Sequence, residues 1–281
     1  MNLKKFLKAA VCGAMIAALA VTAGCGDSDK KAEGKKVLKV GMECAYAPYN
    51  WSQTSAEGGA VKIEGASEYA YGYDVIMAKK LADSMGAELQ IQKIEWDGLA
   101  PAVVSGKIDA AIAGMSITSK RKETVDFTKP YYYANVVALV KKDSPQAQAK
   151  SVEDLRGSVA TSQLNTIWYD QIDQVPEVTK LPAIDTVPGM VVALKSGKCN
   201  LIVTDIPTAK AAAYANPELV MVTFPEDKGF KTSREDVEIG IAVQKGNKEL
   251  LDAMNKVLGG MTEADFNKIM DEAIQKQPLV K

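Results

Sequence analysis

The sequence contains no histidine. Histidine is the usual general acid or base in enzymes and the commonest metal ligand, so its absence removes the ordinary form of both chemistries. Cysteine is scarce as well, with four residues and no Cys-x-x-Cys pair. No serine or cysteine stands in a recognisable nucleophile motif. We therefore expect no metal, no cofactor and no catalytic centre of a common type.

The chain also lacks a charge imbalance. It carries 34 lysines and arginines against 35 aspartates and glutamates, with a formal net charge of −1. Nucleic-acid-binding domains usually show a basic footprint, so we expect no nucleic-acid partner. The 281 residues are 47% hydrophobic, which is ordinary for a globular protein and long enough for two lobes with their own cores.

Long hydrophobic runs are confined to the N-terminus. A lysine-rich start is followed by the apolar residues 9–21 and then by small residues before Cys25. This order is typical of a secretory signal and is too short for a settled membrane span. The small residues resemble the lipobox of bacterial lipoproteins, which predicts a signal peptide over 1–24 and a lipidated tether over 25–35. The alternative is an ordinary signal peptide with a chance cysteine.

Two segments of the chain repeat one pattern. GLAPAVVSGKIDAAIAG begins at Gly98, and GMVVALKSGKCNLIVTD begins at Gly189. Aligned on their shared Ser-Gly-Lys, each predicts an apolar helix, a glycine cap at Gly106 or Gly197, and a strand buried on both faces. The chain therefore carries the same helix–turn–strand unit twice, once in each half.

The repeat also relates two residues at its end. Equal numbers of residues separate the capping glycine from Gly114 in the first copy and from Asp205 in the second. Both positions are expected where a buried strand ends, and ligands of open α/β sheets collect beyond the carboxyl ends of strands. Two facing lobes would place Gly114 and Asp205 across one cleft.

The remaining elements are expected to alternate between strands and helices. This order predicts an α/β fold with largely parallel sheets. Strands are expected at 37–42, 88–94 and 158–163, a crossing strand at 131–140 and a return strand at 237–245. Helices are expected at 75–86, 165–172, 248–260 and 263–275.

Three stretches identify a family resemblance. They are GYDVIMAKKLA from Gly72, the long segment WDGLAPAVVSGKIDAAIAGMSITSKRKETVDFTKPYY from Trp96, and LIVTD. They resemble the polar amino acid class of extracellular solute-binding proteins of ABC importers. The resemblance runs from about Val37 to the C-terminus and implies a two-lobed periplasmic-binding-protein-like (type II) fold. It further implies a lobe I of 36–134 plus 236–281, joined by crossover strands to a lobe II of 135–235.

The resemblance also implies how an amino acid is held. Its carboxylate clamp falls on Arg121, and its acidic group for the α-ammonium falls on Asp205. A guanidinium meets a carboxylate through a planar fork of donors, and each buried charge needs a partner. The other implied substrate-binding residues are Gly114, Ser116, Trp96 as the stacking aromatic, Tyr46 on the opposite wall, Thr166 from lobe II, and Glu43 in the first loop.

Each of these residues also has an ordinary structural interpretation. Arg121 taken alone is a solvated surface charge, and Asp205 is an N-cap for the helix that follows it. Trp96 could be a core residue, and Asp97 is expected to be the N-cap of its helix. Glu43 could be a solvated acid at a strand end.

Two further expectations follow from the resemblance. Asn165 stands where the family usually has a glycine, and asparagine tolerates left-handed backbone geometry. Cys44 falls in lobe I and Cys199 in lobe II. A disulfide between them is possible in an exported protein, but it would restrain lobe closure, so we expect two buried thiols instead.

The function implied is the substrate-binding component of an amino acid ABC importer. We expect an exported monomer, anchored to the cell membrane through Cys25, that delivers a free L-amino acid to a permease and its ATPase. Glu43 favours lysine or arginine. The alternatives are a neutral polar amino acid such as glutamine or cystine, an exported dehydratase or lyase on the same fold, and a sensor or adhesin ectodomain.

Overall fold

Two five-stranded sheets organise the part of the chain that the computed structural model describes, residues 36–278. The signal peptide expected at 1–24, Cys25 and the tether to residue 35 lie outside these residues. No helix between residues 36 and 278 has the length and hydrophobicity that a membrane crossing requires. The described residues belong to one compact unit.

Strands and helices alternate along much of the described chain. The strands are β1 (Val37–Met42), β2 (Ala45–Tyr46), β3 (Asn50–Gln53), β4 (Val61–Lys62), β5 (Tyr69–Tyr71), β6 (Glu88–Lys93), β7 (Ala110–Ala111), β8 (Val125–Phe127), β9 (Tyr132–Tyr133), β10 (Val136–Lys141), β11 (Val159–Thr161), β12 (Thr179–Lys180), β13 (Leu201–Asp205), β14 (Leu219–Val222), β15 (Glu238–Ile239) and β16 (Ala242–Gln244). The α-helices are α1 (Tyr73–Ser84), α2 (Trp96–Val104), α3 (Ser119–Lys122), α4 (Ile167–Gln171), α5 (Val187–Lys195), α6 (Ile206–Ala215), α7 (Arg234–Val237), α8 (Lys248–Leu258) and α9 (Glu263–Lys276).

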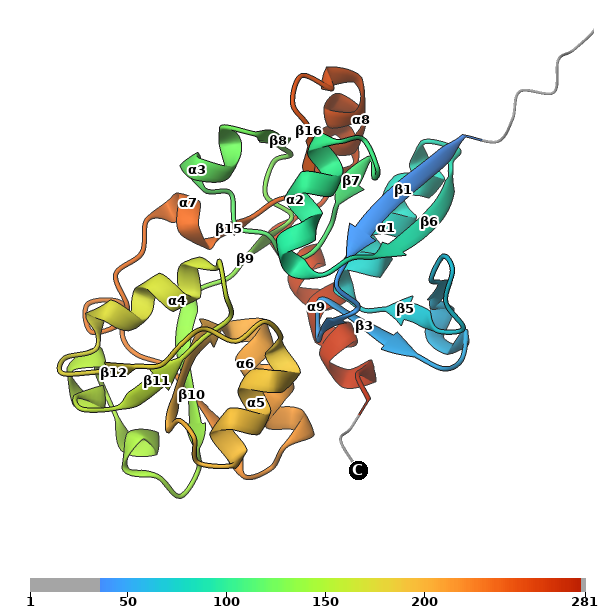
Figure 1. The fold of residues 1–281 in the computed structure, drawn as a ribbon. Coiled ribbons are helices and arrows are strands. Elements are labelled where there is room, and N and C mark those ends of the chain that lie inside the picture. Colours follow the sequence, from blue (N-terminus) through green and yellow to red (C-terminus); the bar gives the residue numbers. More distant parts are fainter. Residues whose placement is uncertain (1–35, 279–281) are drawn as a thin grey trace, which may run out of the picture. The chain divides into compact units, whose positions relative to one another are not determined.

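The first sheet has the strand order β6-β1-β7-β16-β8. Strand β1 pairs in parallel with β6 and β7, whereas β16 runs antiparallel to β7 and β8. Helices α1 and α2 contact this sheet, and the C-terminal helices α8 and α9, drawn in red, return to pack on α1 (Figure 1). We call the part of the structure around this sheet lobe I.

The second sheet has the order β12-β11-β13-β10-β14. Strand β11 is parallel to β12 and β13, and β10 runs antiparallel to β13 and β14. Helices α5 and α6, drawn in gold, lie beside this sheet (Figure 1). We call this part lobe II. The two lobes confirm the predicted α/β class, while the lobe limits at 134/135 and 235/236 stay a prediction.

The two segments that cross between the lobes pair with each other. Strand β9 is antiparallel to β15, and each expected crossing strand is broken into two, β9 with β10 and β15 with β16. The second break falls at Gly240, where a Cβ atom would lie 2.7 Å from the side chain of Ile117. The expectation of largely parallel sheets was wrong at these strands, because a chain that crosses and returns enters each sheet in reverse.

A four-stranded sheet of order β2-β3-β5-β4 precedes α1 and was not predicted. Its strands are two to four residues long, too short for a hydrophobic period to be visible in the sequence. The last of them leads into α1, which begins at Tyr73 rather than at the predicted residue 75. Gly72 adopts φ +127° at this entry, and a Cβ atom there would lie 2.4 Å from the carbonyl oxygen of Tyr49.

The helix and glycine cap of the sequence repeat recur in the structure, but the strands differ in length. Strand β7 ends at Ala111, three residues before Gly114, whereas β13 runs to Asp205. Helices α2 and α5 are followed by Gly106 at φ +71° and Gly197 at φ +78°, the left-handed caps expected there. A Cβ atom on Gly98 would lie 2.9 Å from the Cγ2 atom of Ile94, and the equivalent Gly189 has the same distance to Ile184. Cys44 and Cys199 are buried free thiols, as predicted.

Candidate functional site

Side chains at the strand ends of the two lobes meet through hydrogen bonds. The Tyr46 hydroxyl in lobe I donates to Asp205 Oδ2 in lobe II at 2.9 Å. A second bond has its donor in lobe II and its acceptor in lobe I: Gln163 Nε2 donates to Glu43 Oε1 at 3.1 Å. These contacts bring predicted site residues from both lobes to one place, which we call the inter-lobe site.

Arg121 also reaches across the lobes. It lies in the short helix α3, and its backbone N–H is capped by the side chain of Thr118. Nη1 donates to the Ser116 carbonyl at 2.8 Å and Nη2 to the Asn165 carbonyl at 2.9 Å. The guanidinium carbon lies 5.0 Å from the ring centre of Trp96, within the range of a cation–π contact. Arg121 is therefore half-buried and engaged, rather than a free surface charge.

The guanidinium remains charged in this setting. Burial lowers the pKa of Arg121 to about 10, which still leaves it protonated at neutral pH. A guanidinium carries five N–H donors, and the two backbone carbonyls use only part of them. The group can therefore donate to further acceptors such as carboxylate oxygens.

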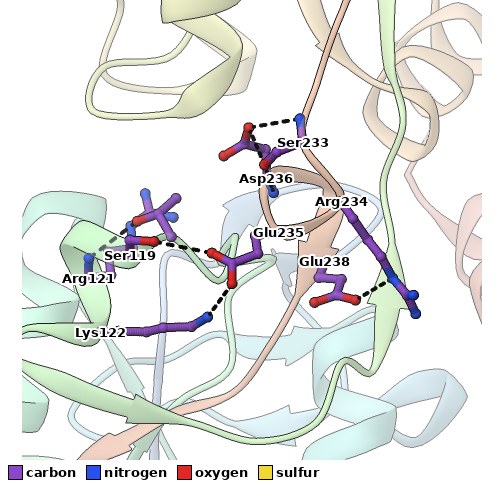
Figure 2. A network of polar contacts seen from close by, with 9 residues as sticks. Ser119, Arg121, Lys122, Ser233, Arg234, Glu235, Asp236 and Glu238 are labelled. Atoms are coloured by element: carbon purple, nitrogen blue, oxygen red, sulfur yellow. Dashed lines mark hydrogen bonds and ion pairs between the residues drawn. The ribbon is translucent and has the colours of Figure 1, made fainter.

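Helix α3 is tied to the return crossing between the lobes. Figure 2 shows Ser119 and Lys122 directed at Glu235 of α7, with Ser119 Oγ at 3.2 Å and Lys122 Nζ at 3.1 Å from its carboxylate oxygens. The helix α7 is itself fixed by a capping box between Ser233 and Asp236. Exposed pairs of this kind contribute little stability. They connect the helix that carries Arg121 to the return crossing.

Asp205 is fully buried at the end of β13. It caps α6, because Oδ1 accepts the Thr208 N–H at 2.9 Å, while Oδ2 accepts the Thr208 hydroxyl at 2.8 Å and the Tyr46 hydroxyl. Burial raises the pKa of this carboxyl, and the three donated hydrogen bonds oppose the rise. The N-cap interpretation is thus correct, and the same carboxylate also faces lobe I.

Arg121 and Asp205 make no ion pair with each other within residues 36–278. Arg121 of lobe I bonds to Asn165 of lobe II, and Asp205 of lobe II bonds to Tyr46 of lobe I. Two opposite charges held apart in this way suit a ligand that carries its own anion and cation, since each end can find a separate partner.

Glu43 is buried rather than solvated, with 4% of its surface exposed. Oε1 accepts the hydrogen bond from Gln163, but Oε2 has no partner among the described residues. Burial, with a smaller contribution from neighbouring carboxylates, raises the pKa of Glu43 to about 8. Such a buried and unsatisfied oxygen is uncommon in folded proteins, which makes Glu43 a candidate for binding a ligand group.

Tyr46 is held in place by stacking and by a close backbone. Its ring lies 4.7 Å from the ring of Tyr49 at an angle of 25°. On another side it meets Gly114, where a Cβ atom would lie 2.6 Å from Tyr46 Cε1. Gly114 has φ +59°, which together with this approach restricts the position to glycine. The hydroxyl of Tyr49 is buried without a partner among the described residues.

The remaining predicted residues make contacts with Arg121 or within the loops around it. Trp96 is half-buried at the first position of α2 and lies against Arg121. Thr166 donates its hydroxyl to the Gln163 carbonyl at 2.8 Å and so closes its own loop. Ser116 contributes its carbonyl oxygen to Arg121, and it forms a bridge with Ile239 of the return crossing.

The loop after β11 contributes more than the sequence indicated. Asn165 has φ +55°, the left-handed geometry expected of it. Its amide donates to Asp97 Oδ1 at 2.8 Å, so Asp97 links the lobes and is not the N-cap, a position taken by Glu95. Gln163 was missed. Its only signal was membership of the same QLNT segment as Thr166.

Within residues 36–278 no three histidine, cysteine, aspartate or glutamate side chains are grouped so that they could hold an ion. What the site offers is one guanidinium, two buried carboxyls and aromatic rings.

Comparison with known proteins gives consistent results. The chain is 31% identical over 281 residues to a probable histidine-binding protein of Campylobacter jejuni, covering 99% of this chain and 100% of the relative. It is 29% identical over 264 residues to the arginine-binding extracellular protein ArtP of Bacillus subtilis, covering 93% and 94%. A crystal structure of an amino acid ABC transporter substrate-binding protein from Streptococcus pneumoniae, bound to L-arginine, superposes with a TM-score of 0.73 at 26% identity, covering 85% and 93%.

The family model agrees with these relatives. It matches residues 38–276, which is nearly all of the part that the structure describes. The chain therefore belongs to the bacterial extracellular solute-binding proteins, family 3.

Proposed function

We propose that this protein is the substrate-binding component of an amino acid ABC importer and that it binds a free L-amino acid at the inter-lobe site. The single observation that carries the proposal is the separation of Arg121 from Asp205, each engaged with the opposite lobe. An amino acid backbone carries a carboxylate and an ammonium at a fixed distance. It is the simplest small molecule that satisfies both charges.

The roles of the two charges follow from their chemistry. The remaining donors of Arg121 meet the carboxylate, and the rigid guanidinium fork favours two parallel hydrogen bonds. Asp205 accepts hydrogen bonds from the α-ammonium. Its Oδ2 atom then either releases the Tyr46 hydroxyl or accepts from both donors. Gly114 and Ser116 lie on the lobe I side of the ligand, Thr166 and its loop on the lobe II side, and Trp96 beside the carboxylate end.

Glu43 then faces the ligand side chain. A cationic group beside Oε2 would supply the partner that this oxygen lacks among residues 36–278. We therefore propose lysine or arginine as the ligand. Relatives named for histidine and arginine are compatible with this choice, and glutamine or cystine is the alternative if Glu43 binds in its protonated form.

The cellular setting is part of the proposal. The N-terminal pattern and the family point to an exported monomer, anchored through a lipid on Cys25 and presenting its ligand to a permease with its ATPase. A receptor of this kind needs micromolar or tighter affinity, about −8 kcal/mol or better. Lobe closure around the ligand would be the signal that the permease reads.

A panel of free amino acids in a thermal-shift assay tests the function. Ligand at about a hundredfold excess over Kd adds roughly 2.7 kcal/mol to the free energy of unfolding. We expect lysine or arginine to raise Tm most. If no amino acid in the panel changes Tm, the proposed function is wrong.

The same panel separates binding from catalysis. We propose that the ligand leaves unchanged, so mass spectrometry after long incubation should recover it intact. A new product would instead favour the dehydratase or lyase alternative, with the protonated Glu43 as acid.

A further inference from the structure

A buried acid outside the proposed ligand contacts connects two of the loops that form the site. Asp74 is the second residue of α1 and lies in the Gly-Tyr-Asp motif noted in the sequence. It is 0% exposed, and no lysine or arginine pairs with it among the described residues. A carboxyl buried without a cation is costly unless hydrogen bonds satisfy it. Its partners therefore indicate what it does.

The first partner leads to the Gly114 turn. The Tyr131 hydroxyl donates to Asp74 Oδ1 at 2.6 Å. The same hydroxyl oxygen accepts the backbone N–H of Gly114 at 3.1 Å. Tyr131 is itself fully buried and stacks on Tyr73 at 5.6 Å. Asp74 thus fixes the turn against which Tyr46 packs.

The second partner leads to Glu43. Asn50 Nδ2 donates to Asp74 Oδ2 at 2.8 Å, and Asn50 Oδ1 accepts the backbone N–H of Cys44 at 2.7 Å. Cys44 has φ +57°, an uncommon geometry for a residue with a side chain. Asn50 therefore stabilises the peptide directly after Glu43 in this uncommon conformation.

The backbone of α1 adds a third contact to the same loop. The N–H groups of Tyr73 and Asp74 donate to the carbonyl oxygens of Pro48 and Tyr49 at 3.0 and 2.8 Å. The first turn of the helix thus holds the segment that carries Tyr46.

The direction of these bonds restricts the residue at position 74. Both neighbours donate, so the position needs two acceptor oxygens, which only a carboxylate side chain of this length supplies. Burial raises the pKa of Asp74 to about 6, and the bonds from Tyr131 and Asn50 oppose the rise. The carboxyl is therefore mostly ionised at neutral pH.

We propose that Asp74 is a positioning residue that sets the Gly114 turn and the Glu43 loop in their ligand-binding geometry from one buried point. The inference rests on the proposed amino acid site. It assigns to the Gly-Tyr-Asp motif a role in ligand affinity, in addition to its packing in the core.

An exchange of two residues tests this role. Asp74→Asn places an amide donor opposite the Asn50 amide, so one arm of the network breaks. Combining Asp74→Asn with Asn50→Asp restores a donor and an acceptor for every bond, since the amide at position 74 then donates to the carboxylate at position 50. Losing a hydrogen bond to a charged group predicts a Kd raised about tenfold or more in the single variant. We expect the double variant to recover most of this loss.

Two further variants separate a loss of positioning from a general loss of stability. Leu81→Ala removes a fully buried side chain seven residues after Asp74 in the same helix, so it should lower Tm but leave Kd nearly unchanged. Tyr131→Phe removes only the hydroxyl that joins Asp74 to Gly114, so it should raise Kd even if Asp74→Asn does not fold. Kd by calorimetry and Tm by thermal unfolding are measured for all variants, with the amino acid that wild type binds.

The outcomes are distinct. The inference is overturned if Asp74→Asn and Tyr131→Phe bind as wild type does, if the double variant stays as weak as the single one, or if Leu81→Ala weakens binding equally. A wild-type protein that binds no amino acid would overturn the proposed function first and this inference with it.

Discussion

We expect Glu43 to make ligand binding sensitive to pH because its carboxyl is buried. With its pKa raised to about 8, this group is largely protonated at pH 6 to 7. A cationic ligand side chain favours the ionised form, so binding releases a proton. Affinity for lysine or arginine should therefore rise with pH between about 6 and 8, by at most about tenfold per pH unit. Calorimetry in this window measures the effect.

A matched variant isolates the contribution of Glu43. Glu43→Gln should bind basic ligands more weakly and with a flat pH profile, whereas Glu68→Gln, at the exposed partner of Lys93, should behave as wild type. Equal losses for basic and neutral ligands in Glu43→Gln would remove the reason to propose lysine or arginine.

Stability should respond to pH in the opposite sense. The folded-state pKa of Glu43 lies above its ordinary value of 4.5, so the stability it contributes is complete below 4.5 and is lost as pH rises through 8. The loss linked to Asp74 ends earlier, near its pKa of about 6. Without ligand, Tm should thus fall between pH 6.5 and 8.5 in wild type and fall less in Glu43→Gln. An equal fall in both would contradict the pKa assigned to Glu43.

Arg121 is the residue whose loss should affect every ligand. Removing one partner of a buried charge pair costs about 3 kcal/mol or more, which is over a hundredfold in Kd. Arg121→Ala should lose this much for all amino acids in the panel, and Arg121→Lys should recover only part, because lysine lacks the planar fork. Arg156→Ala, at an exposed arginine paired with Glu153 and Glu177, is the control. Unchanged binding by Arg121→Ala would refute the carboxylate clamp.

At the level of elements, the turn after β7 is the most constrained part of the site. Gly114→Ala should lose binding, because it adds both left-handed strain of about 1 to 2 kcal/mol and a clash with Tyr46. Gly106→Ala carries the same strain at φ +71° but meets nothing within 4 Å. Comparing Kd and Tm of the two variants separates strain from clash. Similar Kd values in both would show that the approach of Tyr46 does not matter for binding.

The repeat explains why so much of the site could be predicted. Two copies of one helix–turn–strand unit related Gly114 to Asp205, although only Asp205 lies at a strand end, because β7 ends at Ala111. The positive φ of Gly106 and Gly197 follows from the same pattern. The N-cap at Asp205 was foreseeable from the residues after it. Local signals of this kind survive in the sequence because each acts within a few residues.

The parts that were missed depend on distant contacts. Glu43 could be taken for a solvated acid, because nothing near it in the chain indicates that Gln163 covers it from the other lobe. Asp97 looked like a cap and instead bonds Asn165. The short strands β2 to β5 have no period to detect. Burial of a polar side chain by a remote loop leaves no local pattern.

For the whole molecule, we expect the hydrogen bonds between the lobes and the proposed ligand to favour the same closed arrangement. Tyr46→Phe removes the hydroxyl that joins Tyr46 to Asp205 and should shift the population toward open forms when no amino acid is present. Small-angle scattering should then report a larger radius of gyration than for wild type. At saturating amino acid the two proteins should have the same radius. The same radius without amino acid would mean that this bond does not help to close the lobes.

The contact between Arg121 and Trp96 gives the protein an optical reporter of its own. The sequence has three tryptophans, and Trp51 and Trp168 are buried at 5% and 3% exposure. Within residues 36–278, Trp96 is the one tryptophan with a guanidinium over its ring, 5.0 Å from the ring centre. A carboxylate arriving at that guanidinium changes the charge beside the indole, so the emission of a Trp51→Phe, Trp168→Phe variant would titrate with occupancy. The arginine proposed to hold the ligand would thereby also report binding without any added dye.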